Sequence, residues 1–168
     1  MENQLTIVVP IYNEVESIEQ FTLEMDKYLE KTMVASTVLF VNDGSNDGSQ
    51  ALIEAIANRN EKYAFIELKK NRGLSSAIKA GIDQCKTNLV GYIDSDIQTT
   101  PVDFLKYFEF FPEFDMVNGI RLNRKDTVIK KLSSKIANSF RRAMINDGID
   151  DTGCPLKIIK TEYAKRVP

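Results

Sequence analysis

The stretch LTIVVPIYNE, residues 5–14, indicates how this chain folds. It begins with a short, mainly β-branched apolar run that closes on a proline. Such a run is typical of a strand that is buried on both faces. The next residues change at once to a turn and to an acidic residue that can begin a helix. A strand that leads through a turn into a helix is the repeating unit of parallel α/β sheets.

The same pattern of a strand followed by a helix recurs along the chain. Further apolar runs predict buried strands at residues 36–42, 63–68, 88–93 and 114–120. Between them, apolar residues recur at helical spacing in four stripes, within residues 18–29, 52–56, 73–85 and 104–111. This alternation predicts an α/β fold with a mostly parallel, Rossmann-like sheet flanked by helices on both faces.

Composition excludes several classes of protein. The 168 residues, 43% of them hydrophobic, predict a single domain over residues 1–168. The chain has no histidine, which excludes Ser-His-Asp and Cys-His catalysis. Cys85 and Cys154 lack CxxC spacing and are expected to be reduced thiols that pack as small apolar residues. A net charge of -2 gives no overall attraction for nucleic acid. The N-terminus does not resemble a signal peptide, so we expect a cytoplasmic chain.

Acidic turn segments follow three of the predicted strands. They are PIYNE (10–14), NDGSNDGS (42–49) and DSDIQ (94–98). Because the carboxyl ends of parallel strands share one edge of a sheet, ligands gather there. One such segment would be an ordinary loop, whereas three at the same edge predict a site.

Asp94 and Asp96 are candidate metal ligands. In an extended segment, residues two apart point to the same side, so both carboxylates can face one point. Hard oxygen ligands without histidine or thiolate suit Mg²⁺ or Mn²⁺. Gln98, two residues further on, could add a neutral oxygen. The alternative is a solvated turn in which Asp94 caps a helix.

The first two acidic segments also have structural explanations. Ser45 or Asp47 can cap the helix that follows, whereas Asp43, directly after a buried strand, could accept hydrogen bonds from a nucleobase or ribose. Tyr12 could stack on a base and Glu14 could contact the ribose. Alternatively, Glu14 simply favours the dipole of the helix that it begins.

A strongly basic segment lies further along the chain. Residues 121–142 contain eight Lys and Arg side chains against one acid, Asp126. On a helix over residues 129–144, Lys130, Ser134, Asn138 and Arg141 lie opposite an apolar arc of roughly 120°. Solvated helix faces usually mix both signs of charge. The cationic stripe therefore predicts binding to a phosphate, to a membrane surface or to both.

Seven segments, taken together and in order, resemble a known family. They are PIYNE (10–14), VNDGSNDGS (41–49), NRGLSSAIKAGI (71–82), DSDIQTTP (94–101), NGIR (118–121), KKLSSKIAN (130–138) and DDTGCPLKIIK (150–160). The chain resembles the GT-A-fold, inverting glycosyltransferases of the dolichyl-phosphate mannose synthase type. That group includes bacterial enzymes that glycosylate undecaprenyl phosphate. The resemblance covers nearly the whole chain.

The resemblance implies a role for each matching position. Pro10, Tyr12, Glu14 and Asp43 match residues that hold the donor's nucleoside, and Asp94 matches an acid near the ribose and donor phosphates. Asp96 and Gln98 match ligands of a divalent cation, Mg²⁺ or Mn²⁺. Arg121, Lys130 and Ser134 match residues that bind the acceptor's phosphate, and Asp151 lies near the sugar. Asp94, Asp96 and Arg121 are thus the expected catalytic residues. Lys130 is commonly arginine in this family, and lysine lacks the bidentate fork.

The activity implied by the resemblance is metal-assisted transfer of a sugar from a nucleotide-sugar to a polyprenyl phosphate, with inversion. Relatives extend further at the C-terminus, so we expect a truncated catalytic domain that works at the cytoplasmic face of the inner membrane. One alternative is a polysaccharide or protein acceptor, which would require a base such as Asp150 or Asp151. Another is a nucleotide-sugar-binding domain without activity. A nucleotidyltransferase would need a Gly-rich basic loop after the first strand, which PIYNE does not provide.

Overall fold

A computed structural model describes residues 3–111, 113–120 and 154–167 of the chain. The chain divides into two compact units, residues 1–117 with 155–168, and residues 118–154. The first unit contains the sheet and most of the described residues. Several predictions lie outside the described residues: those for Arg121, Lys130, Ser134, Asp150 and Asp151, and the basic helix over residues 129–144.

The core of the first unit is a mixed sheet with strand order β3-β2-β1-β4-β6-β5. Its strands are β1 (Gln4–Ile11), β2 (Ala35–Asn42), β3 (Tyr63–Glu67), β4 (Leu89–Tyr92), β5 (Met116–Asn118) and β6 (Lys157–Lys160). β1 is parallel to both β2 and β4, and β2 is parallel to β3. β6 runs antiparallel to β4. The prediction of a mostly parallel sheet is therefore confirmed.

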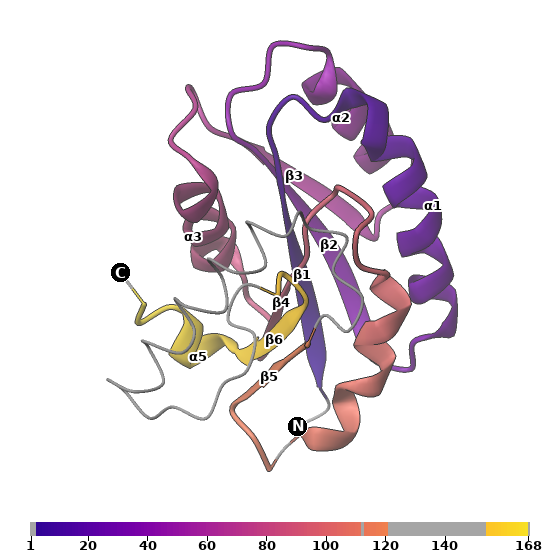
Figure 1. Cartoon of the computed structure of the whole chain (residues 1–168), viewed down its shortest axis with the longest axis vertical. Helices are drawn as coiled ribbons and strands as arrows, with labels where there is room; N and C mark the ends of the chain where they lie inside the picture. The colour runs from indigo at the N-terminus through magenta and orange to yellow at the C-terminus, as the bar shows by residue number, and fades with distance from the viewer. Residues whose placement is uncertain (1–2, 112, 121–153, 168) are drawn as a thin grey trace, which may run out of the picture. The chain divides into compact units, whose positions relative to one another are not determined.

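Helices cover both faces of this sheet, as predicted. They are α1 (Val15–Lys31), α2 (Ser49–Arg59), α3 (Leu74–Gln84), the short α5 (Thr161–Ala164) and two 3-10 helices, η1 (Pro101–Lys106) and η2 (Phe108–Phe110). Figure 1 shows α3 on one side of the strands and α1 with α2 on the other. Within the described ranges, no helix has the length and apolar character needed to cross a membrane.

The face under α1 is packed with aromatic residues. Phe21 of the predicted helical stripe meets Phe40 of β2 edge-on, with ring centroids 6.3 Å apart. Tyr28, about two turns further along α1, meets Phe104 of η1 in the same way at 5.8 Å. All four side chains are at most 1% exposed. Each fully buried aromatic ring stabilises the folded state by roughly 1.5–3 kcal/mol, so this layer fixes α1 against the sheet.

The opposite face holds α3 close to the two central strands. Val8, Val41 and Ala77 belong to one buried apolar cluster there. A Cβ added at Gly81 would lie 2.5 Å from a methyl group of Val8. Only glycine therefore allows α3 to approach β1 at this distance.

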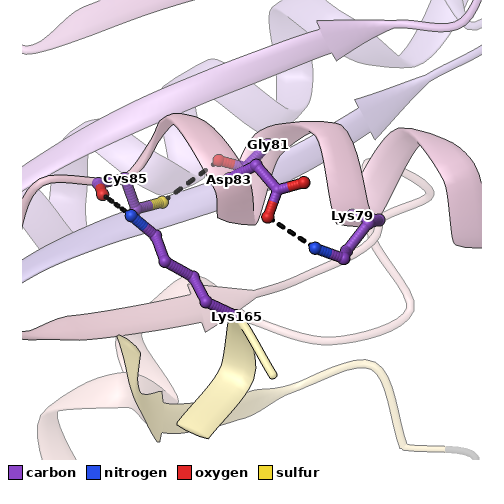
Figure 2. A network of polar contacts seen from close by, with 5 residues as sticks. All are labelled: Lys79, Gly81, Asp83, Cys85 and Lys165. Carbon is purple, nitrogen blue, oxygen red and sulfur yellow. Dashed lines mark hydrogen bonds and ion pairs between the residues drawn. The ribbon is translucent and has the colours of Figure 1, made fainter. Parts of the chain in front are cut away.

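α5 is tied to the end of α3 by a charged side chain. Lys165 donates a hydrogen bond from Nζ to the main-chain oxygen of Cys85, 2.8 Å away (Figure 2). A cation at the carboxyl end of a helix also interacts favourably with the helix dipole. The Cys85 thiol donates to the oxygen of Gly81, and its burial raises its pKa to about 11. Cys85 and Cys154 are both buried thiols, so the prediction that they pack as small apolar residues is confirmed.

Three expectations about the elements are wrong. Strands over 63–68 and 114–120 were expected to be buried on both faces, but β3 and β5 form the two edges of the sheet and are partly exposed. The predicted helix within 104–111 is instead the 3-10 pair η1 and η2, with bonds such as Tyr107 N–H to the Phe104 oxygen. β6 was not predicted, because four residues that begin and end with lysine give only a weak strand signal.

A tight approach of two loops requires glycine directly after β2. Gly44 has a φ of +73°, and a Cβ there would lie 2.7 Å from the main-chain nitrogen of Asn71 and 2.8 Å from the carbonyl carbon of Lys70. Main-chain atoms cannot turn aside as a flexible side chain can. The loop after β2 and the loop before α3 therefore stay in contact only if residue 44 has no side chain.

We predict that Gly44→Ala destabilises the fold by about 2–4 kcal/mol, because it combines left-handed strain with overpacking. Gly48→Ala is the matched control, since Gly48 also has a positive φ (+99°) but has ordinary room for a Cβ, 3.8 Å from a Val15 methyl group. It should lose only about 1 kcal/mol. Urea unfolding of the two variants measures the difference, and equal losses would contradict the proposed steric conflict.

Candidate functional site

The register of the sheet brings three strand ends together. β1 and β2 pair in parallel up to Ile11 and Asn42, and the N–H of Asp43 donates to the oxygen of Ile11 at 2.8 Å. β4 ends where Tyr92 pairs with Val8. The N–H of Ile93 then donates to the oxygen of Val8 at 3.3 Å, and Asp94 lines the same cavity as Pro10. The segments after β1, β2 and β4 consequently leave the sheet at one edge, as predicted.

A cavity of about 360 Å³ lies at this carboxyl edge. It is lined by Pro10, Ile11, Tyr12, Glu14, Asp43, Asn71, Gly73, Leu74, Ala77, Asp94, Ser95 and Asp96. Six of the seven predicted donor and metal residues within the described ranges are in this set. The exception is Gln98, which is exposed and does not line the cavity.

A larger open hollow, about 530 Å³, lies at the opposite, amino end of the strands. Met33, Thr37 and Thr87 are among its lining residues, and none of the described residues that line it is acidic. The threonine hydroxyls nearby bond to one another, with Thr6 and Thr87 2.8 Å apart. This hollow therefore lacks the chemistry of the carboxyl edge, and the smaller cavity is the candidate site.

The backbone that holds Tyr12 and Glu14 is locked by side chains from the loop after β2. The N–H groups of residues 13, 14 and 15 donate to Ser45 Oγ, Ser49 Oγ and Asp47 Oδ2, each at 3.0 Å. Asn13 has a φ of +55°, and its side-chain oxygen accepts the N–H of Asn46 at 2.9 Å. Few non-glycine residues adopt this conformation, and asparagine is among those that tolerate it. The two loops thus form one rigid wall of the cavity.

Asp47 joins the amino ends of two helices. Its Oδ1 accepts the N–H of Ser49, the first residue of α2, at 3.0 Å and the Ser49 hydroxyl at 2.6 Å, while Oδ2 accepts the first N–H of α1. The N-cap residue of α2 is Gly48, so Asp47 binds the first N–H of the helix from one position before the cap. Desolvation acts to raise the pKa of Asp47, but the hydrogen bonds from Ser49 and Val15 outweigh this effect, so the pKa is lowered.

Asp43 is a buried acid at the back of the cavity, with 2% of its surface exposed. Its two carboxylate oxygens accept the main-chain N–H groups of Arg72 and Gly73, both at 2.8 Å. Asp43 thereby fixes the turn that begins α3. That turn forms the wall of the cavity with Asn71 and with Leu74, whose side chain is 53% exposed.

Asp94 and Asp96 both line the cavity, although the segment is not extended as expected. Residues 95–99 form a series of bends, and Ile97 has a φ of +61°. The N–H of Gln98 donates to Asp96 Oδ1 at 3.1 Å. This turn interrupts the two-residue alternation after Asp96, which explains why Gln98 is not on the cavity wall. The prediction that Gln98 continues the line of ligands rested on that alternation.

Tyr92 was not predicted from the sequence as a site residue. Its hydroxyl donates a short hydrogen bond to Asp94 Oδ1. Burial and this bond, together with the charges of Asp94 and Asp96, raise the pKa of Tyr92 above its ordinary value, so the phenol stays neutral. The sequence contains only a weak signal for such a role, because a tyrosine at the end of a buried strand is usually a packing residue.

The cavity wall is acidic and lacks a cation among the residues that the structure describes. Glu14, Asp43, Asp94 and Asp96 line it, whereas no lysine or arginine does. In residues 3–111, 113–120 and 154–167, no three Asp, Glu, Cys or His side chains form a cluster that could hold a metal by themselves. Carboxylate oxygens in such small number fit a magnesium-like ion, which keeps waters and shares phosphate oxygens of its substrate.

Comparison with protein families identifies the chain. The sequence model of "Glycosyl transferase family 2" matches residues 6–167, nearly the whole length. The chain belongs to glycosyl transferase family 2. The family expected from the seven sequence segments is therefore confirmed.

Two curated relatives within this family carry the same name. An undecaprenyl-phosphate 4-deoxy-4-formamido-L-arabinose transferase from Pectobacterium atrosepticum is 32% identical over 162 residues, which is 91% of this chain and 47% of the relative. The enzyme of that name from Proteus mirabilis is 33% identical over 160 residues, or 92% of this chain and 48% of the relative. The chain spans about half the length of these curated relatives.

Solved structures confirm the GT-A fold. A mannosyltransferase from Pyrobaculum calidifontis in complex with GDP-Man and Mn²⁺ matches 99% of this chain and 47% of its own, with a TM-score of 0.69 and 19% identity. A glucosyl-3-phosphoglycerate synthase from Mycobacterium tuberculosis in complex with Mn²⁺, UDP-glucose and phosphoglyceric acid matches 95% of this chain and 57% of its own. Its TM-score is 0.73 and its identity 16%.

We predict that Asp47 makes folding stability depend on pH at the acid end. Because its pKa is lowered on folding, its contribution is present above the ordinary aspartate value of about 3.9 and is lost as the pH falls through the folded-state pKa. Asp47→Asn should therefore destabilise the protein at neutral pH, since one carboxylate oxygen becomes an amide that cannot accept the N–H of Val15. The difference between wild type and variant in urea unfolding should shrink below about pH 4. A difference that stays constant down to pH 2 would contradict this assignment.

Proposed function

We propose that this chain, acting as one catalytic domain, binds a nucleotide-sugar in the carboxyl-edge cavity and transfers its sugar with inversion to a polyprenyl phosphate. The supporting observation is that Tyr12 and the acids Glu14, Asp43, Asp94 and Asp96 line one cavity in a member of glycosyl transferase family 2. The names of the curated relatives, which are undecaprenyl-phosphate sugar transferases, support the acceptor class.

The nucleoside of the donor is proposed to bind along Pro10, Tyr12, Glu14 and Asp43. Tyr12 is 47% exposed, so its ring offers a face on which a base can stack. Glu14 and Asp43 offer acceptors for base or ribose hydrogens. A carboxylate has about four lone-pair sites, so the two main-chain N–H groups bound to Asp43 use only part of its capacity.

The donor diphosphate is proposed to bind near Asp94 and Asp96 together with Mg²⁺ or Mn²⁺. Asp96 would hold the cation, and Asp94 would face the ribose and phosphates. Gln98, which the resemblance matches to a second ligand, does not line the cavity among the described residues. When bound, such a cation neutralises negative charge on the leaving diphosphate as a Lewis acid. The Mn²⁺ in two solved relatives of the fold supports this choice of cation.

The acceptor phosphate is proposed to bind to Arg121, Lys130 and Ser134, with Asp151 near the sugar. An oxygen of the phosphate forms a bond to the anomeric carbon on the face opposite the diphosphate, whose bond to that carbon breaks. A phosphate is already anionic at neutral pH, so it needs no strong base, which suits a chain without histidine. The cationic groups supply orientation and charge-assisted hydrogen bonds. A polyprenyl acceptor would bring the protein to a membrane surface, which we propose is the cytoplasmic face of the inner membrane.

A second candidate is nucleotide-sugar binding without turnover. It is worth separate measurement because the chain spans about half the length of the curated relatives. Donor binding combined with failure to glycosylate undecaprenyl phosphate would favour this candidate. Transfer to a polysaccharide or protein, but not to the lipid phosphate, would instead favour a different acceptor class.

We predict that UDP- or GDP-sugars raise the melting temperature of the chain, and that Mn²⁺ increases the shift. Asp96→Ala should remove the Mn²⁺-dependent part, because the ion loses a carboxylate ligand. In calorimetry with Mn²⁺, donor affinity should fall at least about tenfold, which corresponds to about 1.4 kcal/mol.

The matched control for this prediction is Asp103→Ala. Asp103 is a half-buried acid that pairs with Lys106 at 2.6 Å, both within η1, and it does not line the cavity. This variant should keep wild-type donor affinity. If Asp96→Ala bound the donor as well as the control does, Asp96 would not be a metal ligand.

We predict that Lys130→Ala raises the KM for undecaprenyl phosphate roughly tenfold or more, since a charge-assisted hydrogen bond to the acceptor phosphate is lost. Donor affinity should not change. Lys106→Ala, which removes a lysine paired with Asp103, provides the comparison. A fall in donor affinity in Lys130→Ala would assign this lysine to the nucleotide instead.

A further inference from the structure

A tyrosine hydroxyl lies directly behind the acidic pair of the cavity. Tyr92 is the last residue of β4, and its hydroxyl donates to Asp94 Oδ1. Asp94 lines the cavity with Asp96, which follows two residues later. Tyr92 itself is half-buried and is not a lining residue. Among the described residues, the carboxylate of Asp94 links Tyr92 to the cavity.

The neighbouring strand holds the ring of Tyr92 in place. Lys157 of β6 is its direct partner in the antiparallel register, so both side chains lie on the same face of the sheet. The Lys157 ammonium lies 5.8 Å from the centroid of the Tyr92 ring. A cation over an aromatic face at this distance is attracted by the ring.

Along this face of the sheet, the side chains change from apolar in the core to charged at the cavity. Two residues earlier on the same face, Val90 of β4 lies opposite Ile159 of β6. Val90 belongs to the buried apolar cluster under α3, and Ile159 packs against that cluster. Tyr92 and Lys157 come next and combine apolar bodies with polar ends. Asp94 follows at the cavity. A tyrosine at this step can keep its ring against the core while its hydroxyl reaches the carboxylate.

Such a bond has a use at this place in the site. Asp94 lies directly before the bends of residues 95–99, outside regular strand pairing, and it lines the cavity together with Asp96, so two like charges share one site. A hydrogen bond from a neutral donor fixes one oxygen of Asp94 and stabilises its charge. Preorganised ligands bind more tightly because their ordering is not required at the moment of binding.

We propose that Tyr92 is a positioning residue for the donor site: its hydroxyl orients the Asp94 carboxylate toward the nucleotide-sugar, and Lys157 holds the tyrosine ring. This inference rests on the proposed function, because it assumes that Asp94 meets the donor. It adds a residue outside the cavity wall to the machinery of that site.

The test is Tyr92→Phe, which keeps the ring and its contact with Lys157 but removes the hydroxyl. Calorimetry in the presence of Mn²⁺, with the UDP- or GDP-sugar that the wild type binds, should give Tyr92→Phe a dissociation constant roughly three to ten times that of the wild type. Without Mn²⁺ the change should be less than about twofold, because Asp94 is proposed to act next to the cation-bound diphosphate. A merely structural defect would weaken binding equally under both conditions.

Tyr63→Phe is the matched control, since it removes the same kind of bond elsewhere. The Tyr63 hydroxyl of β3 donates to the Asp26 carboxylate at 2.6 Å, and neither residue lines the cavity. This variant should bind the donor like the wild type, even if its melting temperature falls.

The outcomes distinguish failure of the role of Tyr92 from failure of the proposed function. If the wild type binds the donor and Tyr92→Phe binds it equally well with Mn²⁺, the positioning role is overturned while the proposed function stands. An equal loss of affinity with and without Mn²⁺ also overturns it, in favour of a structural role. If the wild type binds no nucleotide-sugar, the proposed function fails and the inference fails with it.

Discussion

The carboxyl edge of this protein depends on a set of hydrogen bonds between the loops after β1 and β2. Three consecutive main-chain N–H groups, those of residues 13–15, donate to side chains of Ser45, Asp47 and Ser49. Without these acceptors, the amino end of α1 would have unpaired donors. The same bonds fix the positions of Tyr12 and Glu14 relative to Asp43, so helix capping and the construction of the cavity wall are one feature.

A second constraint is electrostatic. Four acids line a single cavity, and like charges at such proximity are unfavourable unless each is stabilised. The structure meets this need differently for each acid: main-chain N–H groups bind Asp43, the Tyr92 hydroxyl binds Asp94, and the Ser17 hydroxyl binds Glu14 at 2.8 Å. Asp96 is the most exposed of the described acids in this group. Its environment is the one best suited to an ion that brings its own waters and phosphate ligands.

Much of the fold could be predicted because burial leaves a local trace. Strands β1, β2 and β4 are continuous apolar runs, and the helical stripe from Ile18 to Leu29 is buried as its spacing indicated. The wrong predictions concern elements whose environment depends on their neighbours in the fold. β3 and β5 are edge strands, and β6 is too short to give a pattern of its own. The position of a strand within a sheet depends on the tertiary structure, so the residues of that strand alone do not predict it.

The parallel α/β class, the family and the acids that follow three strands were all predictable from the amino-acid sequence, because strand periodicity, turn residues and motif order are local. Which groups contact those acids depends on the folded arrangement of the chain. Ser49 and Glu14 are 35 positions apart and Ser45 and Asn13 are 32 apart, and both pairs meet through the register of β1 with β2. The turn at Ile97, which removes Gln98 from the cavity wall, and the bond from Tyr92 to Asp94 likewise depend on backbone conformation. The spacing of residues predicts the direction of their side chains only where the backbone is regular. The acids of this site lie where the backbone is irregular.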